Sequence, residues 1–372
     1  MIRQLNTGLA GHWIGDLPEG CKMCVYGQKA VIFVTGICNK PKDCNWYCPI
    51  SNERKDKDVI YVNERKVNNI KEIIEECLIS NARGASITGG EPLLRLKRVI
   101  EIIDMLKKAF GKAFHIHLYT NGLFATKSII EQLYRSGLDE IRFHILTENT
   151  LNAMRYAKKL GLKVGMEIPV IPGKSEEIKE IIQILDREHF DFINLNEFEI
   201  TESNYESVTS RGYMPDRDKL FAVKGSFNTA LEILKWSRKN IKTLNVHFCP
   251  IWVKDSVQLR NRFKNRARNV AKPYEKINED GLLERVIIYL KDNSRINKIK
   301  EALIEKIPEK KVFVNFEKNE IYLHPDYVTS SIFDSLITEY GDSIKKIEIT
   351  EETPTYERVL MTATPLWTKK DK

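Results

Sequence analysis

The sequence shows no long hydrophobic run and none of the features expected of a secretory leader. None of its apolar stretches approaches the roughly 20 residues that a membrane-spanning helix needs. The first residues, MIRQLNTGLAGHWIGDLPEG, lack the charged, apolar and small-residue regions of a signal peptide. We therefore expect a cytoplasmic protein without a membrane span.

A disulfide framework is also missing. The chain has seven cysteines in 372 residues, an odd number that argues against a disulfide scaffold in a long chain. Five of them lie between residues 21 and 48, while Cys77 and Cys249 stand alone. Cys77 lies on the apolar face of a predicted helix, so we expect it in the core. Clustered thiols in a reducing compartment favour metal binding.

Long repeats, low-complexity tracts and a strong charge of one sign are absent too. With 42% apolar and 30% charged residues, the composition is that of a soluble globular protein. The net charge of +8 permits an anionic partner without requiring one. The length suggests two domains, or one large α/β domain with an appendage.

Predicted strands and helices alternate along residues 30–250. The strands are AVIFVTG, GASITGG, FHIHLYTNG, LDEIRFHI, LKVGMEIPVIPG, FDFINLNEFEI and TLNVHFC, and amphipathic segments separate them. This alternation predicts a parallel sheet of right-handed βαβ units, in the form of a partial (β/α)6–7 TIM-like barrel. In such a barrel the chemistry lies at the carboxyl ends of the strands.

The alternation stops near residue 250. Residues 254–272 hold seven basic side chains against Asp255 alone. This pattern suits RNA phosphates, a lid over the open barrel, or a solvated face packed against the second domain. The remaining strands and helices follow a βαββαβ order, the ferredoxin-like plan. The expected organisation is a metal-knuckle segment at 1–29, the α/β core at 30–250, a basic helix and linker at 251–282, and a ferredoxin-like domain at 283–372.

Three cysteines follow the first predicted strand. Cys38, Cys44 and Cys48 lie in ICNKPKDCNWYCP. Thiolates on a flexible loop suit an iron–sulfur cluster, and three ligands leave one iron open for a substrate or cofactor. A zinc loop or a set of reduced thiols is the alternative. The turn TGGEPLL follows at the next strand end, where glycines let the backbone approach a ligand and Glu91 can accept from an amine.

The order of strand, cysteine loop, GGEP and TNG resembles the radical S-adenosylmethionine (SAM) enzymes. The resemblance implies that Cys38, Cys44 and Cys48 bind a [4Fe–4S] cluster whose open iron chelates the amine and carboxylate of SAM. Reductive cleavage would give methionine and a 5′-deoxyadenosyl radical that abstracts hydrogen from a substrate. The cofactor-binding residues implied by the motifs are Gly89, Gly90, Glu91 and Pro92 around the methionine amine, Tyr47 near the adenine, and Asn121. The usual cysteine spacing of three and two residues is five and three here.

Other segments resemble an archaeal branch of unknown substrate that is related to pyruvate formate-lyase activating enzymes. These segments are CKMCVYG, NLNEFEIT and HFC with KDSVQLRNR. The resemblance implies the chemistry, and the substrate is expected to be a protein glycine, an RNA nucleoside or a small metabolite. It also implies an electron donor of the ferredoxin or flavodoxin type. The rival hypothesis is a non-catalytic, metal-stabilised module that binds nucleic acid.

A second metal site is predicted from Cys21 and Cys24 in GCKMCVYG. Their Cys-x-x-Cys-x-x-Gly pattern has the shape of a zinc or rubredoxin knuckle. Cys249 and His247, at the end of the last core strand, can complete a zinc or mononuclear iron site. The alternatives are an auxiliary iron–sulfur cluster with Cys249, or thiols without metal.

Polar residues within the predicted strands are the remaining candidates. His144 and Glu167 alternate with apolar neighbours, so they can point into the barrel and contact a ribose or a carboxylate. Core polar groups that are satisfied by the protein are the alternative. The strand NLNEFE is unusually polar for a buried parallel strand, and Asn196 and Glu197 are its candidate catalytic residues on the substrate side.

Overall fold

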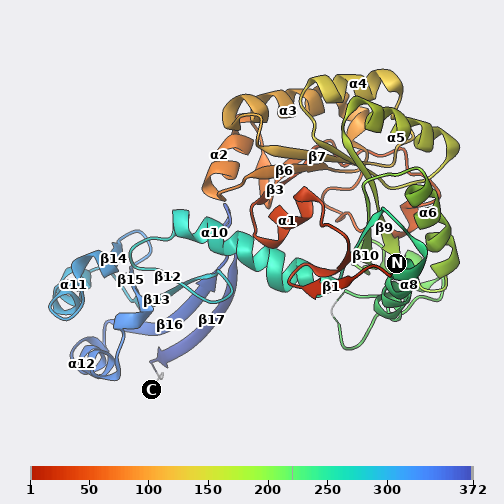
Figure 1. The fold of residues 1–372 in the computed structure, drawn as a ribbon. Coiled ribbons are helices and arrows are strands. Elements are labelled where there is room, and N and C mark those ends of the chain that lie inside the picture. Colours follow the sequence, from red (N-terminus) through yellow and green to blue (C-terminus); the bar gives the residue numbers. More distant parts are fainter. Residues whose placement is uncertain (1, 220, 370–372) are drawn as a thin grey trace. The chain divides into compact units, whose positions relative to one another are not determined.

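The computed structural model describes residues 2–219 and 221–369 (Figure 1). Its internal contacts divide the chain into two compact units, residues 1–259 and residues 260–372. Each unit has an apolar core of its own. Within the described residues, no helix is both long enough and apolar enough to span a membrane.

The first unit is built on a run of parallel strands. They are β3 (Lys29–Phe33), β6 (Gly84–Thr88), β7 (His115–Thr120), β8 (Glu140–Phe143), β9 (Lys163–Val170), β10 (Phe192–Glu197) and β11 (Asn245–Cys249). Their order in the sheet is their order in the sequence. This is the succession that repeated right-handed βαβ units produce, and it confirms the predicted partial barrel.

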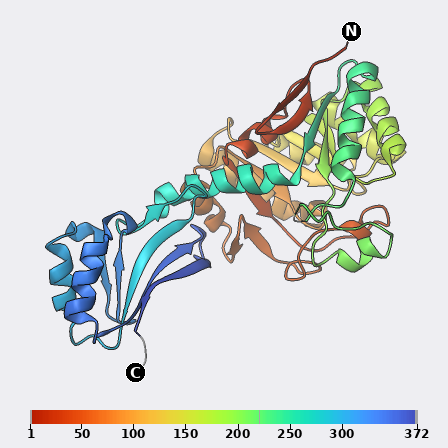
Figure 2. The same cartoon turned by 90° about the horizontal axis from the view of Figure 1, so that it is seen from below.

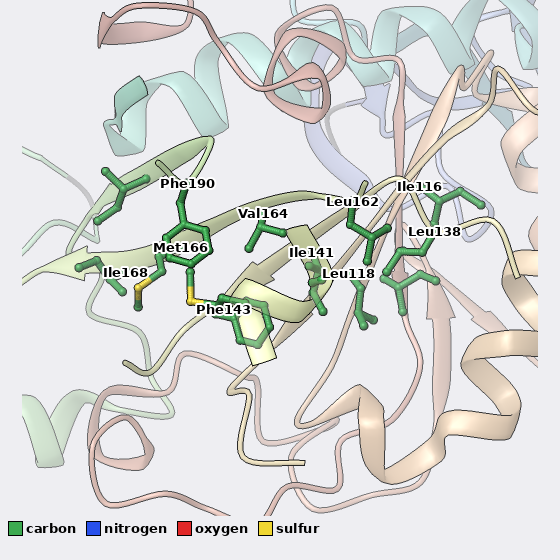
Figure 3. Packing of buried hydrophobic residues seen from close by; sticks show 14 of the residues in the cluster. Ile116, Leu118, Leu138, Ile141, Phe143, Leu162, Val164, Met166, Ile168 and Phe190 are labelled. Atoms are coloured by element: carbon green, nitrogen blue, oxygen red, sulfur yellow. The ribbon is translucent and has the colours of Figure 1, made fainter. Parts of the chain in front are cut away.

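Helices on the outer side connect these strands. They are α2 (Lys71–Ile79), α3 (Leu96–Phe110), α4 (Lys127–Arg135), α5 (Glu148–Leu160), α6 (Ser175–Arg187) and α8 (Ser226–Asn240). In α3, Val99, Ile102 and Leu106 recur at helical spacing and are fully buried. Strand residues such as Ile141 and Val164 pack in the same core (Figure 3). Apolar side chains of the strands thus face the helices, and polar side chains of the strands face the inner side of the sheet.

Short hairpins flank both edges of the parallel sheet. At one edge β3 pairs antiparallel with β4 (Ile60–Val62), which pairs with β5 (Arg65–Val67). At the other edge β11 pairs antiparallel with β2 (Gly11–Ile14), which pairs with β1 (Leu5–Gly8). These strands were not predicted from the sequence, because three or four residues are too few to show a period of two. Their pairing leaves the barrel open.

The helix α1 (Glu19–Val25) lies on the inner side of the sheet and packs against β3, β6 and β7 (Figure 1). Gly20 makes this approach possible. A Cβ at that position would lie 2.5 Å from ring atoms of His117 and 2.9 Å from Nη2 of Arg142. We call the space between α1 and the carboxyl ends of the strands the lumen. The remaining short elements of this unit are η1 (Asn45–Tyr47), η2 (Pro92–Arg95), α7 (Tyr205–Thr209), α9 (Ile251–Val253) and the π-helical turn η3 (Lys254–Leu259).

The second unit begins with α10 (Arg260–Val270) and contains an antiparallel sheet with two helices on one face (Figure 2). Its elements are β12 (Lys276–Ile277), β13 (Leu283–Leu290), α11 (Ile296–Ile304), η4 (Glu309–Lys311), β14 (Val312–Asn315), β15 (Glu320–Leu323), η5 (Pro325–Tyr327), α12 (Ser330–Tyr340), β16 (Ile344–Glu352) and β17 (Leu360–Thr368). The sheet order β14-β15-β13-β16 is that of the ferredoxin-like plan.

Two features of the second half differ from the sequence-based expectation. Strand β17 pairs antiparallel with β16 and adds an edge to the ferredoxin-like sheet. The division between the units falls after Leu259, so α9 and η3 belong with the α/β core. The boundaries of the four predicted segments stay predictions.

Candidate active site

The lumen opens into one cavity of about 630 Å³ at the carboxyl ends of the strands. Polar side chains reach it from alternate positions of the strands, since residues two apart in a strand face the same side. The predicted site residues that line it are Cys21, Cys24, Cys38, Cys44, Tyr47, Cys48, Gly89, Gly90, Pro92, Asn121, His144, Glu167, Asn196, His247 and Cys249. The fold thus brings together residues that lie more than 200 positions apart.

The loop that carries Cys38, Cys44 and Cys48 leaves the end of β3 and borders this cavity with all three thiols partly exposed. The backbone N–H of Lys40 donates to Sγ of Cys38 at 3.3 Å. Burial raises the pKa of Cys38. Burial, together with the thiols of Cys38 and Cys48, raises the pKa of Cys44 to about 12. The loop therefore gathers three thiols that interact with one another.

The GGEP turn follows β6 and packs against the cysteine loop. A Cβ at Gly90 would lie 2.4 Å from the carbonyl oxygen of Ile37, so only glycine allows this approach. The backbone N–H of Gly90 donates to the carbonyl oxygen of Thr35 at 2.7 Å. The turn presents Gly89, Gly90 and Pro92 to the cavity.

Glu91 points away from the cavity and joins neighbouring strand ends. Its Oε1 accepts hydrogen bonds from Oγ1 of Thr120 at 2.8 Å and from the N–H of Leu93 at 3.0 Å. Its Oε2 accepts from the N–H of Asn121 at 2.7 Å. Burial raises the pKa of Glu91, and these hydrogen bonds offset part of that effect. The structure thus gives this carboxylate partners within the protein, where the sequence suggested an amine of the ligand.

Asn121 links the TNG turn to the cysteine loop. Its Nδ2 donates to Oδ1 of Asn39 at 2.7 Å, and its Oδ1 accepts from the N–H of Leu123 at 3.0 Å. Asn39 is the residue after Cys38. The side chain of Asn121 therefore positions the loop as well as bordering the cavity.

Tyr47 and His144 form a hydrogen-bonded pair in the cavity wall. Nδ1 of His144 lies 2.7 Å from the carbonyl oxygen of Glu167, so this nitrogen carries the proton. Nε2 then accepts from the hydroxyl of Tyr47 at 2.8 Å. Burial lowers the pKa of His144 and keeps the imidazole neutral. The pair holds the tyrosine ring in a fixed place beside the last two cysteines of the loop.

A buried ion-pair network that was not predicted from the sequence also lies in the lumen. Arg142 is 2% exposed and donates to Glu140 at 2.6 Å and to Glu167 at 2.7 Å. Glu167 also accepts from Nδ2 of Asn194 at 2.9 Å and from Nδ2 of Asn196 at 3.0 Å. Burial alone would raise the pKa of Glu167, but the charge of Arg142 and the two amides lower it to about 2.

The alternation of strand residues could have revealed Arg142, since it lies two positions before His144. Tyr119, Gln258 and Lys254 also line the cavity and were not predicted. Lys254 forms an ion pair with Glu199. No local signal marks Gln258, because it reaches the cavity only through the π-helical turn.

Glu197 lies outside the cavity wall. Its Oε2 accepts from the N–H of Ile251 at 2.9 Å, and its Oε1 lies 3.3 Å from Nζ of Lys219. Adjacent residues of a strand face opposite sides. Because Asn196 faces the lumen, Glu197 turns the other way, and the structure does not bring it to the site.

The second predicted metal set lines the same cavity. Cys21 and Cys24 come from α1, and His247 and Cys249 come from β11. Burial would raise the pKa of Cys21, but the charges of Arg142 and His247 lower it to about 7. Among residues 2–219 and 221–369, no three His, Cys, Asp or Glu side chains are close enough to hold a single metal ion.

The residues present fit a [4Fe–4S] cluster and SAM. The three loop cysteines would supply soft thiolate ligands from one segment, and a backbone N–H already points at Sγ of Cys38. A cluster spreads its thiolates over several irons, so it does not require the close grouping of a single-ion site. The GGEP backbone gives a bulky cofactor a close approach without side-chain obstruction.

Comparisons with known proteins give the family of this chain. Residues 20–147 match the family model described as the Radical SAM superfamily. A Methanocaldococcus jannaschii protein named as a candidate glycyl-radical enzyme activating enzyme is 39% identical over 367 residues, which cover 96% of this chain and 94% of that protein. The GTP 3′,8-cyclase of Helicobacter pylori strain J99 is 26% identical over 187 residues, or 46% of this chain and 57% of the cyclase. The crystal structure of Streptococcus suis SuiB bound to S-adenosylmethionine aligns with 60% of this chain and 50% of its own, at 14% identity and a TM-score of 0.43.

The family match begins at α1 and includes the cysteine loop, the GGEP turn and the TNG turn. The Methanocaldococcus relative extends the similarity through both units. The chain therefore belongs to the radical SAM superfamily, as an enzyme that cleaves S-adenosylmethionine reductively at a [4Fe–4S] cluster to generate a 5′-deoxyadenosyl radical.

Proposed function

We propose that this enzyme activates a partner protein by removing a hydrogen atom from one of its glycines. The observation that carries the chemistry is the convergence of the three loop thiols and the GGEP turn on one cavity. The choice of a glycine rests on the Methanocaldococcus relative, whose similarity covers nearly the whole length of both chains.

In this proposal Cys38, Cys44 and Cys48 hold the cluster. When bound, the cluster supplies the electron that cleaves SAM. The turn at Gly89, Gly90 and Pro92 holds the methionine end with backbone groups, and Asn121 fixes the position of the cysteine loop. Tyr47, held by His144, packs beside the adenine.

Asn196 is the substrate-side residue of this proposal. Its Nδ2 donates a hydrogen bond to the carboxylate of Glu167, and its side chain borders the cavity. Glu197 takes no direct part, because its carboxylate accepts from the backbone of Ile251. Glu167 serves as a fixed anion that orients Asn196 and balances Arg142.

An electron donor of the ferredoxin or flavodoxin type completes the proposal, along with the cytoplasmic location expected from the sequence. Reductive cleavage needs one electron for each SAM. The loop cysteines are partly exposed, so an external donor can approach the cluster that they hold. The second predicted metal is not needed for this function.

The RNA and small-metabolite substrates stay predictions. Two of the seven basic residues that suggested RNA serve the fold. Lys254 pairs with Glu199, and Arg266 is 5% exposed and donates to the carbonyl oxygen of Pro354. This leaves less basic surface than the sequence alone suggests for an RNA partner or for a non-catalytic nucleic-acid module.

The experiment has two stages with separate readouts. The anaerobically reconstituted protein is reduced with SAM, and 5′-deoxyadenosine is measured. We expect product from the wild type and from Cys77→Ala, a buried thiol in α2, and none from Cys38→Ala. Absence of product from the reconstituted wild type would refute the assignment of the cluster and SAM sites.

The second stage tests the glycine. The reduced enzyme is incubated with the protein fraction of source cells grown on glycine deuterated at Cα. We expect deuterium in 5′-deoxyadenosine and a glycyl-radical signal by electron paramagnetic resonance. If 5′-deoxyadenosine forms without deuterium and without that signal, SAM cleavage stands and the glycine substrate is wrong.

A further inference from the structure

Three thiols outside the cysteine loop line the lumen. Cys21 and Cys24 lie one helical turn apart on α1, and Cys249 ends β11. All three line the cavity that the cysteine loop also borders. Because Gly20 has no Cβ, α1 can lie against the ring of His117. This close approach places the thiols of Cys21 and Cys24 in the lumen.

A carboxamide lies between two of these sulfur atoms. Sγ of Cys24 donates to Oε1 of Gln258 at 3.0 Å, and Nε2 of Gln258 lies 3.6 Å from Sγ of Cys249. Gln258 belongs to the π-helical turn η3, an element that is rare and often marks functional sites. The two sulfur atoms therefore face a common position that a flexible side chain now fills.

The surroundings of Cys21 suit a sulfur with negative charge. Nδ2 of Asn194 donates to its Sγ at 3.3 Å, and Nη2 of Arg142 donates at 3.6 Å. Hydrogen bonds from outer groups orient metal ligands and are a regular part of metal sites. Cys77 offers the contrast, because it lies within the main apolar cluster, as a core thiol does.

His247 is not part of the ligand set that this geometry favours. Its Nε2 lies 2.7 Å from the carbonyl oxygen of Ala10, and its Nδ1 lies 3.2 Å from Oδ1 of Asn194. Both ring nitrogens thus have oxygen atoms of the protein within hydrogen-bond distance, and the ring also interacts with the thiol of Cys21. These partners occupy the ring nitrogens, so neither offers a free lone pair to a metal.

We propose that the thiolates of Cys21, Cys24 and Cys249 bind a second metal centre in the lumen, with iron or zinc as the metal. Soft thiolate ligands select these metals over hard cations. The three sulfur atoms are too far apart in this structure to surround a single ion. Binding therefore requires Gln258 to leave its place between Cys24 and Cys249, or an iron–sulfur core that spans the gap.

The test uses the full-length Cys38→Ala/Cys44→Ala/Cys48→Ala variant, which lacks the ligands of the first cluster. One sample is treated anaerobically with iron and sulfide and another with zinc, and bound metal per chain is measured after desalting. We expect metal to be retained in at least one arm. Visible absorption in the iron arm identifies an iron–sulfur core, and retention in the zinc arm alone identifies a zinc site. No retained metal in either arm overturns the proposal.

Substitution of the ligands gives the second readout. Adding Cys24→Ser and Cys249→Ser to the same variant is expected to abolish retention, while adding Cys77→Ala leaves it unchanged. Equal retention with and without Cys24 and Cys249 overturns the ligand assignment. If the serine variant fails to fold, spectra of the parent variant replace it and need no further substitution. Where the zinc arm retains metal, cobalt(II) is expected to give a near-ultraviolet thiolate-to-cobalt charge-transfer band; where only the iron arm retains metal, sulfur-to-iron charge-transfer absorption is expected. Retained metal without the matching band overturns the thiolate ligands.

Discussion

Replacing Glu167 by glutamine tests the ion-pair network that holds the lumen in shape. The carboxylate of Glu167 accepts from Arg142 at 2.7 Å, from Asn194 at 2.9 Å and from Asn196 at 3.0 Å. Glutamine has nearly the same size but carries no charge. Its NH₂ group would also face N–H donors, so at least one hydrogen bond is lost.

The expected magnitude follows from the pKa of Glu167. Its pKa falls from the usual 4.5 to about 2, because Arg142 and the two amides outweigh the effect of burial. One pKa unit corresponds to about 1.4 kcal/mol, so the ionised carboxylate contributes on the order of 3 kcal/mol to the free energy of unfolding at neutral pH. A pKa that is lower in the folded state gives stability that is complete above pH 4.5 and is lost as the pH falls toward 2.

The assay is urea unfolding followed by tryptophan fluorescence. Four of the five tryptophans, Trp13, Trp46, Trp236 and Trp252, lie in the first unit. We expect Glu167→Gln to lower the free energy of unfolding of this unit by about 3 kcal/mol at pH 7, and the difference from wild type to shrink to roughly half at about pH 3.

The matched control is Glu188→Gln at the protein surface. Glu188 also pairs with an arginine, Arg155, at 2.8 Å. Because solvent screens this exposed pair, its contribution is expected to be much smaller than that of Glu167. If Glu167→Gln costs no more than Glu188→Gln, or if the loss does not diminish in acid, the network does not stabilise the lumen as we argue.

Three further substitutions test local geometry. Gly20→Ala should lower the free energy of unfolding in urea by about 1–3 kcal/mol, because the new Cβ would lie 2.5 Å from ring atoms of His117. The control Gly8→Ala should be neutral, because no atom lies nearer than 3.4 Å to its Cβ. Equal effects of the two substitutions would contradict the placement of α1. Tyr47→Phe removes the hydroxyl that donates to His144, so we expect the free energy of unfolding to fall by about 1 kcal/mol and calorimetry to show weaker SAM binding. An unchanged affinity for SAM would argue against the position of Tyr47 beside the adenine. Glu91→Gln weakens three hydrogen bonds between strand ends, so it should lower the free energy of unfolding by about 1.5–3 kcal/mol and slow the formation of 5′-deoxyadenosine. Full activity of this variant would show that the link is dispensable.

The parallel core was predictable because its signals are local. Each strand is a short β-branched run, and each helix repeats apolar residues at a helical spacing, as in α3. The hairpins β1–β2 and β4–β5 were missed because their strands have three or four residues. Strand β17 was missed because LMTATPLWT shows no alternation, and every residue except Trp367 is largely exposed.

Within the site, strand parity explains which of the predicted residues line the cavity and which do not. His144 and Glu167 were predicted to point inward from their apolar neighbours, and both line the cavity. The same parity separates Asn196, which faces the lumen, from Glu197, which does not. The sequence-based choice of Glu197 followed the density of polar residues and ignored this alternation.

The sequence by itself determined the cofactor chemistry of this protein. Three cysteines at one strand end and GGEP at the next are local patterns, and their residue types suit an iron–sulfur cluster and a close backbone contact. Only the tertiary structure decided which distant groups share the cavity. It placed Arg142 between two carboxylates, turned Glu91 into the protein, and brought Gln258 between thiols from α1 and β11. These outcomes depend on the register of strands and on a glycine that admits α1, and neither is encoded in the spacing of a motif.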